Sequence, residues 1–99
     1  MSSSAAELHK PGIVTVVVTN EALRVDLSDG RSLIVPLDWF PRLQHATHSE
    51  RNAWRLIGHG NGIHWEALDE DISMDGLLAG RASVESRASF QRWLASRKG

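Results

Sequence analysis

The chain has 99 residues, of which 41% are hydrophobic and 23% charged, and its formal net charge is -1. This length and composition are typical of one folded globular domain and argue against a disordered chain. The nearly balanced charge argues against nonspecific nucleic-acid binding, which needs many Lys and Arg on one face. Cysteine is absent, which excludes disulfides, thiolate metal sites and cysteine nucleophiles.

Residues 1–12 predict a flexible leader, because they are rich in Ser and Ala and end in Pro11-Gly12. They lack the basic start and the apolar core of a signal peptide. The longest strongly apolar stretch, residues 13–18, is far shorter than the ~18 residues that a membrane span needs. We therefore expect a cytoplasmic protein that does not enter a membrane.

Residues 13–19 are dense in β-branched side chains and predict the first strand of a three-stranded antiparallel meander. A two-residue turn at Asn20-Glu21 would place large apolar residues opposite one another on a single face. The facing pairs of this register are Val18–Leu23, Val16–Val25 and Val14–Leu27.

The second turn of the meander contains Asp29-Gly30, a signal for positive backbone φ angles. A strict two-residue loop would pair Val25 with Ile34, whereas an odd-length loop or a bulge keeps every large apolar group on the core face. We prefer the odd-length loop. Its facing pairs are Leu27–Leu33, Val25–Val35 and Leu23–Leu37.

Short helices are predicted next in the chain. Asp38 is expected to cap a helix over residues 39–44, with Pro41 in its first turn. Thr47 and Glu50 have the spacing of a capping box, which predicts a helix over residues 48–53.

Residues 55–58 and 62–65 read as two strands around a glycine-rich turn. Ser73 is expected to cap a helix over residues 74–79, which Gly80 ends in a left-handed conformation. Residues 86–98 predict an amphipathic helix whose apolar face carries Phe90, Trp93, Leu94 and the stem of Arg97. The fold class is therefore α+β, with a domain over 13–80 and a C-terminal helical extension over 81–99.

Residues 23–80 carry several short blocks in a fixed order: LSDGR, VPLDWFPRL, ER, WRLIG, GIHW, LDEDIS and GLL. In these blocks the chain resembles a bacterial and phage family known as domain of unknown function 2442, or DUF2442. Glu66 stands where the family pattern usually has proline, so the turn after Trp65 is expected to be looser here.

The resemblance implies a compact α+β fold and no established catalytic residues. Some members of the family resemble companions of a second small protein encoded beside them, as in toxin–antitoxin pairs. Others precede a helix-turn-helix domain. The resemblance therefore implies an antitoxin-like or regulatory partner-binding role.

Histidines and carboxylates do not assemble into a recognisable metal or catalytic motif in this sequence. The spacings of His45, His48, His59 and His64 match no known zinc site, and no nucleophile, base and orienting group stand together. A glycine-rich turn over 58–62 lacks the Lys of a phosphate-binding loop. We expect no enzyme activity, no bound metal and no cofactor.

The sequence instead favours a non-catalytic interaction module that binds another small protein. Tryptophan is common in binding hot spots, and Trp39 is expected at the surface beside Arg42, whereas Trp54 and Trp65 are expected mainly in the core. The predicted contact residues are Trp39, Arg42, His64, Trp65, Asp69, Glu70 and Asp71.

Two alternatives stay open. The C-terminal cations Arg81, Arg87, Arg92, Arg97 and Lys98 could pair with the acidic run 66–75 within the chain, between two copies in a homo-oligomer, or with a partner. They could also let the C-terminal helix bind nucleic acid, although no base-reading motif is present.

Overall fold

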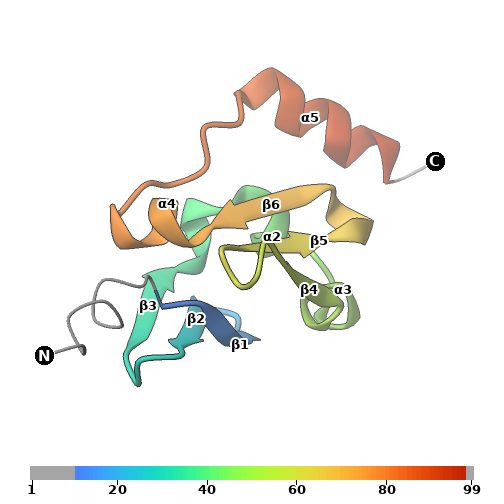
Figure 1. Ribbon diagram of the computed structural model, residues 1–99. Helices are drawn as coiled ribbons and strands as arrows, with labels where there is room; N and C mark the ends of the chain where they lie inside the picture. Colours follow the sequence, from blue (N-terminus) through green and yellow to red (C-terminus); the bar gives the residue numbers. More distant parts are fainter. Residues whose placement is uncertain (1–10, 98–99) are drawn as a thin grey trace, which may run out of the picture.

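The computed structural model describes residues 11–97, which form two small antiparallel sheets with short helices and a C-terminal helix (Figure 1). The α+β class is thus confirmed. The first sheet has the order β1 (Ile13–Val18), β2 (Ala22–Leu27), β3 (Ser32–Pro36). The second has the order β4 (Trp54–Ile57), β5 (Gly62–Trp65), β6 (Glu70–Ser73). Most of the predicted leader, residues 1–10, lies outside the described residues, as does Lys98.

The first hairpin has the predicted register near its turn but not at its open end. Val18 faces Leu23 and Val16 faces Val25, whereas Leu27 faces Ile13 instead of Val14 because a bulge interrupts β1. The Ile13 N–H donates to Gly60 O at 2.8 Å, which ties the start of β1 to the other hairpin. The extra residue of the bulge changes which side chains face inward. Ile13 is consequently buried and Val14 is 53% exposed.

The second hairpin has an odd-length loop, as predicted, but its register lies two residues from the predicted one. Leu23 faces Val35 and Val25 faces Leu33. Leu27 N–H donates to Arg31 O, which leaves a three-residue loop with Gly30 at φ 93. A shift of two preserves the face of every side chain, because the period of a strand is two.

The first helical segment begins earlier than predicted and is divided. A 3₁₀ turn, η1 (Leu37–Trp39), precedes α2 (Pro41–Gln44), whose N-cap is Phe40. Asp38 is therefore not the cap, since the buried Leu37 N–H bonds to Glu21 O and η1 turns before α2 begins. Pro41 takes the tolerated first position of α2.

The capping predictions further along the chain are confirmed. Thr47 and Glu50 form the complete capping box of α3 (His48–Asn52). Ser73 caps α4 (Met74–Leu78), and Gly80 after this helix has φ 75.

The strand β6 lies in the acidic run, for which the sequence did not predict a strand. The 3₁₀ turn η2 (Glu66–Leu68) ends at Asp69, which has a left-handed φ of 50, and β6 follows at once. Asp and Glu disfavour strands, so local propensity hides this element. It forms because Ile72 pairs with Ile63 and is buried with it.

The core lies between the two sheets and the short helices and contains sixteen buried hydrophobic residues. The largest fully buried side chain is Trp65, whose indole N–H donates to Arg51 O at 3.0 Å. Arg51 is itself buried, and its guanidinium donates to the carbonyls of Leu43 and Gln44 and to Asn20 Oδ1. This arginine adds side-chain donors at the C-terminal end of α2, where Leu43 O also accepts the Ala46 N–H.

The predicted C-terminal helix is present as α5 (Arg87–Ser96), with Ser86 as its N-cap. It lies along one side of the molecule, joined to α4 by the segment 79–86 (Figure 1). None of its residues is buried. The ring of Phe90 packs edge-on against His45, and Arg97 forms an ion pair with Glu50 at 2.6 Å, so α5 docks on its own domain. Within residues 11–97 no helix is long and apolar enough to cross a membrane.

Candidate partner-binding groove

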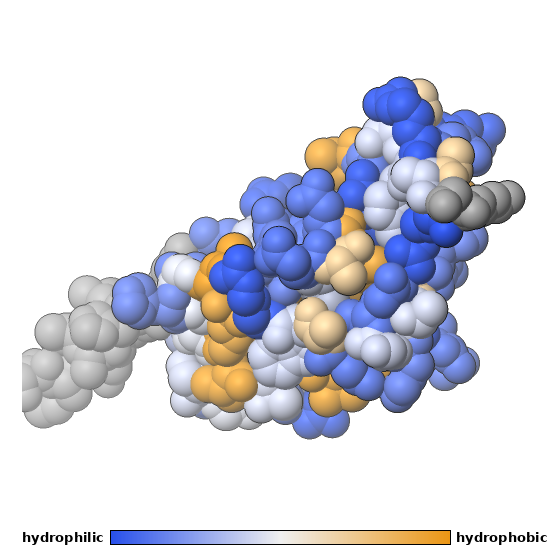
Figure 2. All heavy atoms as spheres, turned by 90° about the vertical axis from the view of Figure 1, so that its right-hand side faces the viewer, coloured by the Kyte–Doolittle hydropathy of each residue, from blue (hydrophilic) through white to orange (hydrophobic). Residues whose placement is uncertain are grey.

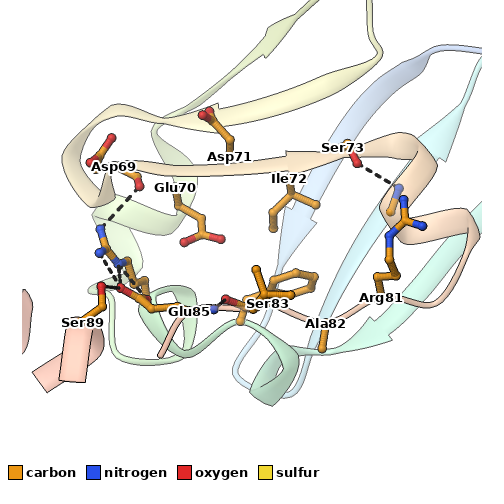
Figure 3. Close-up of a pocket in the computed structure, with 14 residues that line it drawn as sticks. Asp69, Glu70, Asp71, Ile72, Ser73, Arg81, Ala82, Ser83, Glu85 and Ser89 are labelled. Carbon is orange, nitrogen blue, oxygen red and sulfur yellow. Dashed lines mark hydrogen bonds and ion pairs between the residues drawn. The ribbon is translucent and has the colours of Figure 1, made fainter. Parts of the chain in front are cut away.

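A cavity of about 500 Å³ opens between β6 and the segment 81–86, which we call the arm. Residues 69–73 line one side and residues 81–85 the other (Figure 3). Two buried hydrophobic side chains, Phe40 and Ile72, belong to its lining. The cavity is therefore a groove with charged rims and an apolar portion.

The groove stays open because the arm forms its hydrogen bonds with elements other than β6. Arg81 N–H donates to Gly76 O, and Ser83 N–H donates to Trp39 O, both at 2.9 Å. These bonds hold the arm to α4 and η1. The edge of β6 is left uncovered between them.

The backbone of β6 has an open hydrogen-bonding edge beside the groove. Met74 N–H donates to Asn61 O, so the hydrogen-bonded pairs of β5 and β6 are Ile63–Ile72 and Trp65–Glu70. In an antiparallel ladder, hydrogen-bonded and non-hydrogen-bonded pairs alternate. Asp71 and Ser73 belong to non-hydrogen-bonded pairs, so the N–H and C=O of Asp71 and the N–H of Ser73 point away from β5. Within residues 11–97 no other segment provides these groups with a backbone partner.

Arg42 fastens the arm to the domain at one end of the groove. Its guanidinium donates to both carboxylate oxygens of Glu85 and, through Nη1, to Leu68 O at 2.8 Å. Both side chains of the ion pair are largely buried, with 15% and 11% exposed. The hydrogen bond from Arg42 holds the pKa of the Glu85 carboxyl below its usual range.

Glu70 is the one acidic side chain of β6 that points into the groove (Figure 3). It is half-buried and, within the described chain, has no hydrogen-bond donor. Burial raises the pKa of its carboxyl to about 7, against the opposing attraction of Arg42. The nearby Arg42 does not donate to Glu70, because Glu85 and the carbonyl groups take its hydrogen bonds. Glu70 is thus a desolvated acidic group that lacks a partner.

His64 belongs to a separate cluster on β5. Its Nδ1 lies 2.5 Å from Asp71 Oδ1 and its Nε2 lies 3.1 Å from Glu66 Oε1. The hydrogen bond with Asp71 is the main cause of a raised pKa of His64. The cluster links β5 to β6, and among residues 11–97 no group of three or more His, Asp or Glu is placed to hold a metal ion.

The groove brings together four of the seven predicted contact residues: Arg42, Asp69, Glu70 and Asp71. His64 and both tryptophans are not part of its lining. Trp65 is fully buried and presents no surface to a partner. Trp39 is half-buried against the core, so the expectation of an exposed Trp39 is wrong; its carbonyl accepts a bond from the arm instead.

Sequence reasoning did not identify Phe40, Glu85 or the arm as parts of this site. Arg42 and Glu85 are 43 residues apart, and no local pattern indicates that they meet. Pairing between the acidic run and the C-terminal cations within the chain was one open alternative, but Arg97 pairs with Glu50 of α3 instead. Arg87 and Arg92 are exposed.

The rest of the described surface has a different character. Its exposed large hydrophobic residues are Val14, Val17, Ile34 and Leu78, whereas the exposed Val84 belongs to the groove lining. On the face drawn in Figure 2, hydrophobic side chains form separate patches divided by hydrophilic ones. That face therefore has no single broad apolar surface, which leaves the groove as the better-defined site.

The chain is similar to two solved structures and to one family. A protein of unknown function from Rhodospirillum rubrum is 29% identical with a TM-score of 0.66, and the match covers 81% of this chain and 96% of that one. An uncharacterized protein from Chromobacterium violaceum shares the fold at 23% identity and a TM-score of 0.64, covering 97% of this chain and 83% of that one. No curated protein matches. The family model described as "Protein of unknown function (DUF2442)" matches residues 13–83, so the chain belongs to the DUF2442 family.

Proposed function

We propose that this protein is a non-catalytic interaction module that binds another small protein through the groove between β6 and the arm. The observation that carries the proposal is the half-buried Glu70, which points into the groove and receives no hydrogen bond from residues 11–97. A desolvated carboxylate is costly unless a charged or polar partner satisfies it. A partner protein that enters the groove supplies that group.

The chemistry of the groove supports binding over catalysis. Its arginine and one of its carboxylates, Arg42 and Glu85, are joined to each other. The Ser89 hydroxyl donates to the same carboxylate, at 2.7 Å, and not to a general base. His64 is held between two carboxylates outside the groove lining. This arrangement offers hydrogen-bonding and charge complementarity without an assembled nucleophile and base.

The regulatory form of the proposal comes from the family resemblance, which implies an antitoxin-like companion of a neighbouring small protein. We place this pairing in the cytoplasm, where a cysteine-free chain needs no oxidising compartment. If the partner is toxic when expressed alone, co-expression of this chain is expected to restore growth.

Affinity capture from the native cells tests the proposal. The bait carries an N-terminal tag and is compared with Glu70→Arg, which reverses the charge in the groove, and with Glu21→Arg, the same change at an exposed turn. We expect a stoichiometric small protein with the wild type and with Glu21→Arg, and at least tenfold less of it with Glu70→Arg.

Thermal unfolding of each variant establishes that it is folded before capture. Equal capture by Glu70→Arg, or capture of nothing by the wild type, would contradict the proposal. Capture of nuclease-sensitive nucleic acid alone would point instead to the C-terminal helix.

A further inference from the structure

We infer that the groove receives an extended segment of the partner protein, which adds an antiparallel strand to β6 and places one Lys or Arg side chain beside Glu70. This inference rests on the proposed function and names the chemistry of its partner. Two independent features of the groove carry it: the free backbone edge and the unmatched acidic charge.

The backbone edge fixes how the segment lies. The N–H and C=O of Asp71, a residue of the groove lining, both point away from β5 at the open edge, so a residue opposite Asp71 can exchange two hydrogen bonds with it. The Ser73 N–H adds a further donor at the same edge. Binding by strand addition takes its affinity from such main-chain bonds and its specificity from alternate side chains.

The charges around the groove determine which charge the bound segment carries beside Glu70. Its lining contains the acidic residues Asp69, Glu70, Asp71 and Glu85, against two cations, Arg42 and Arg81. Since Arg42 is taken by Glu85 and Leu68 O, the excess is negative at Glu70. A cationic side chain complements this position, and an acidic one is repelled.

The side-chain spacing follows from the geometry of β6. Glu70 and Ile72 are two residues apart, and both belong to the groove lining. Residues opposite them in an added strand are likewise two apart and share one face. The segment therefore carries a cation and an apolar residue separated by one residue, the cation opposite Glu70 and the apolar residue opposite Ile72.

A short peptide with this pattern is the direct probe. Acetyl-Ser-Val-Thr-Lys-Ser-amide is titrated into the full-length ¹⁵N-labelled protein, and the matched peptide has Glu in place of Lys. We expect amide shift changes at residues 69–73 and 81–86. We also expect Glu70→Gln to weaken binding of the Lys peptide about tenfold, because one charged contact is lost. The control substitution Glu21→Gln is expected to leave the affinity unchanged.

Backbone methylation of the peptide separates strand addition from simple charge attraction. The Thr of the probe lies opposite Asp71 and bonds to it, whereas the N–H of the Lys is directed away from β6. N-methylation of Thr is expected to abolish binding, and N-methylation of Lys is expected to weaken it far less. Equal effects of the two methyl groups would overturn the inference, as would binding of the Glu peptide at the same affinity, or shift changes confined to other surfaces.

The outcome also separates this inference from the proposed function. If Glu70→Arg loses the captured partner but the wild-type protein does not bind the peptide, strand addition is wrong and the interaction module stands. If the peptide binds but no protein is captured from cells, the groove has the inferred preference and the proposed function fails.

Discussion

Residues 13–80, which form the domain, and residues 81–97, which form the extension, are stabilised by different kinds of interaction. All sixteen buried hydrophobic residues of the described chain belong to the domain. The extension contributes no buried residue. It is attached by the ion pairs Arg42–Glu85 and Arg97–Glu50, by two backbone hydrogen bonds of the arm, and by the contacts of Phe90 with His45 and of Trp93 with Arg42. The domain is stabilised by the burial of hydrophobic side chains, whereas the extension is held by a few polar and aromatic contacts.

This difference explains why a groove exists where the two parts meet. On the domain side the groove is bordered by the edge strand β6, and the arm opposite it has no regular secondary structure. A segment with few buried contacts opens at a lower free energy than a packed core. The arm can therefore adjust to a ligand while β6 keeps its geometry.

The sharpest test of the difference compares two tryptophans. Trp65 is fully buried and hydrogen-bonded to Arg51 O, whereas Trp93 is half-buried beneath Arg97 at 4.5 Å. We expect Trp65→Ala to lower the free energy of unfolding by about 3–5 kcal/mol and Trp93→Ala by about 1 kcal/mol. Chemical denaturation measures both. Similar losses would mean that α5 is part of the cooperative core.

Arg51 offers a test within the domain. Replacement by Met keeps much of the side-chain volume but removes the guanidinium hydrogen bonds to Leu43 O, Gln44 O and Asn20 Oδ1. We expect a loss of about 2–4 kcal/mol, because three charge-assisted hydrogen bonds of a buried side chain are lost. The matched change Arg55→Met, at an exposed residue of β4, is expected to cost less than about 0.5 kcal/mol. A cost for Arg51→Met no larger than this would contradict the role of Arg51.

The pH dependence of Glu70 tests the groove. Its folded pKa of about 7 lies above the ordinary value of 4.5, so its contribution to stability is complete below 4.5 and is lost as the pH rises through about 7. We expect Glu70→Gln to be more stable than the wild type at pH 8, by on the order of 1–2 kcal/mol after solvent screening, and equal to it below pH 4.5. Denaturation at the two pH values measures this. A difference that does not change with pH would show that Glu70 is solvated.

The smallest effect is expected at the distal end of α5. The hydrogen bond from Arg97 lowers the pKa of Glu50 to about 2, so the stability from this carboxylate is present above 4.5 and is lost as the pH falls through about 2. Arg97→Gln should cost at most about 1 kcal/mol globally, because the pair is partly exposed. Faster amide exchange in α5 alone is the expected signature. Faster exchange in β1–β3 as well would contradict the separation of the two parts.

Local signals in the sequence predicted much of the fold. The Thr47–Glu50 capping box, the Ser73 cap and the inward face of the first hairpin all depend on neighbours a few residues away. The misses have non-local causes. The bulge at Val14 accompanies a bond from Ile13 to Gly60, and β6 is a strand only because Ile72 packs beside Ile63.

The candidate site was predictable only in part for the same reason. The acidic residues of β6 were identified because their charge is visible in the sequence. The arm and Glu85 were not, since their role depends on the approach of Arg42 from a distant helix. The high tryptophan content led to the prediction that Trp65 contacts a partner, whereas in this small domain Trp65 fills the core.

Hydrogen exchange of the protein, free and bound to its captured partner, tests the central claim most directly. We expect new protection at Asp71 and Ser73 and along residues 81–86, with little change on the outer face of β1–β3. Protection around Val17 and Ile34, with exchange at Asp71 and Ser73 unchanged, would show that the partner binds elsewhere and that the groove is not its site.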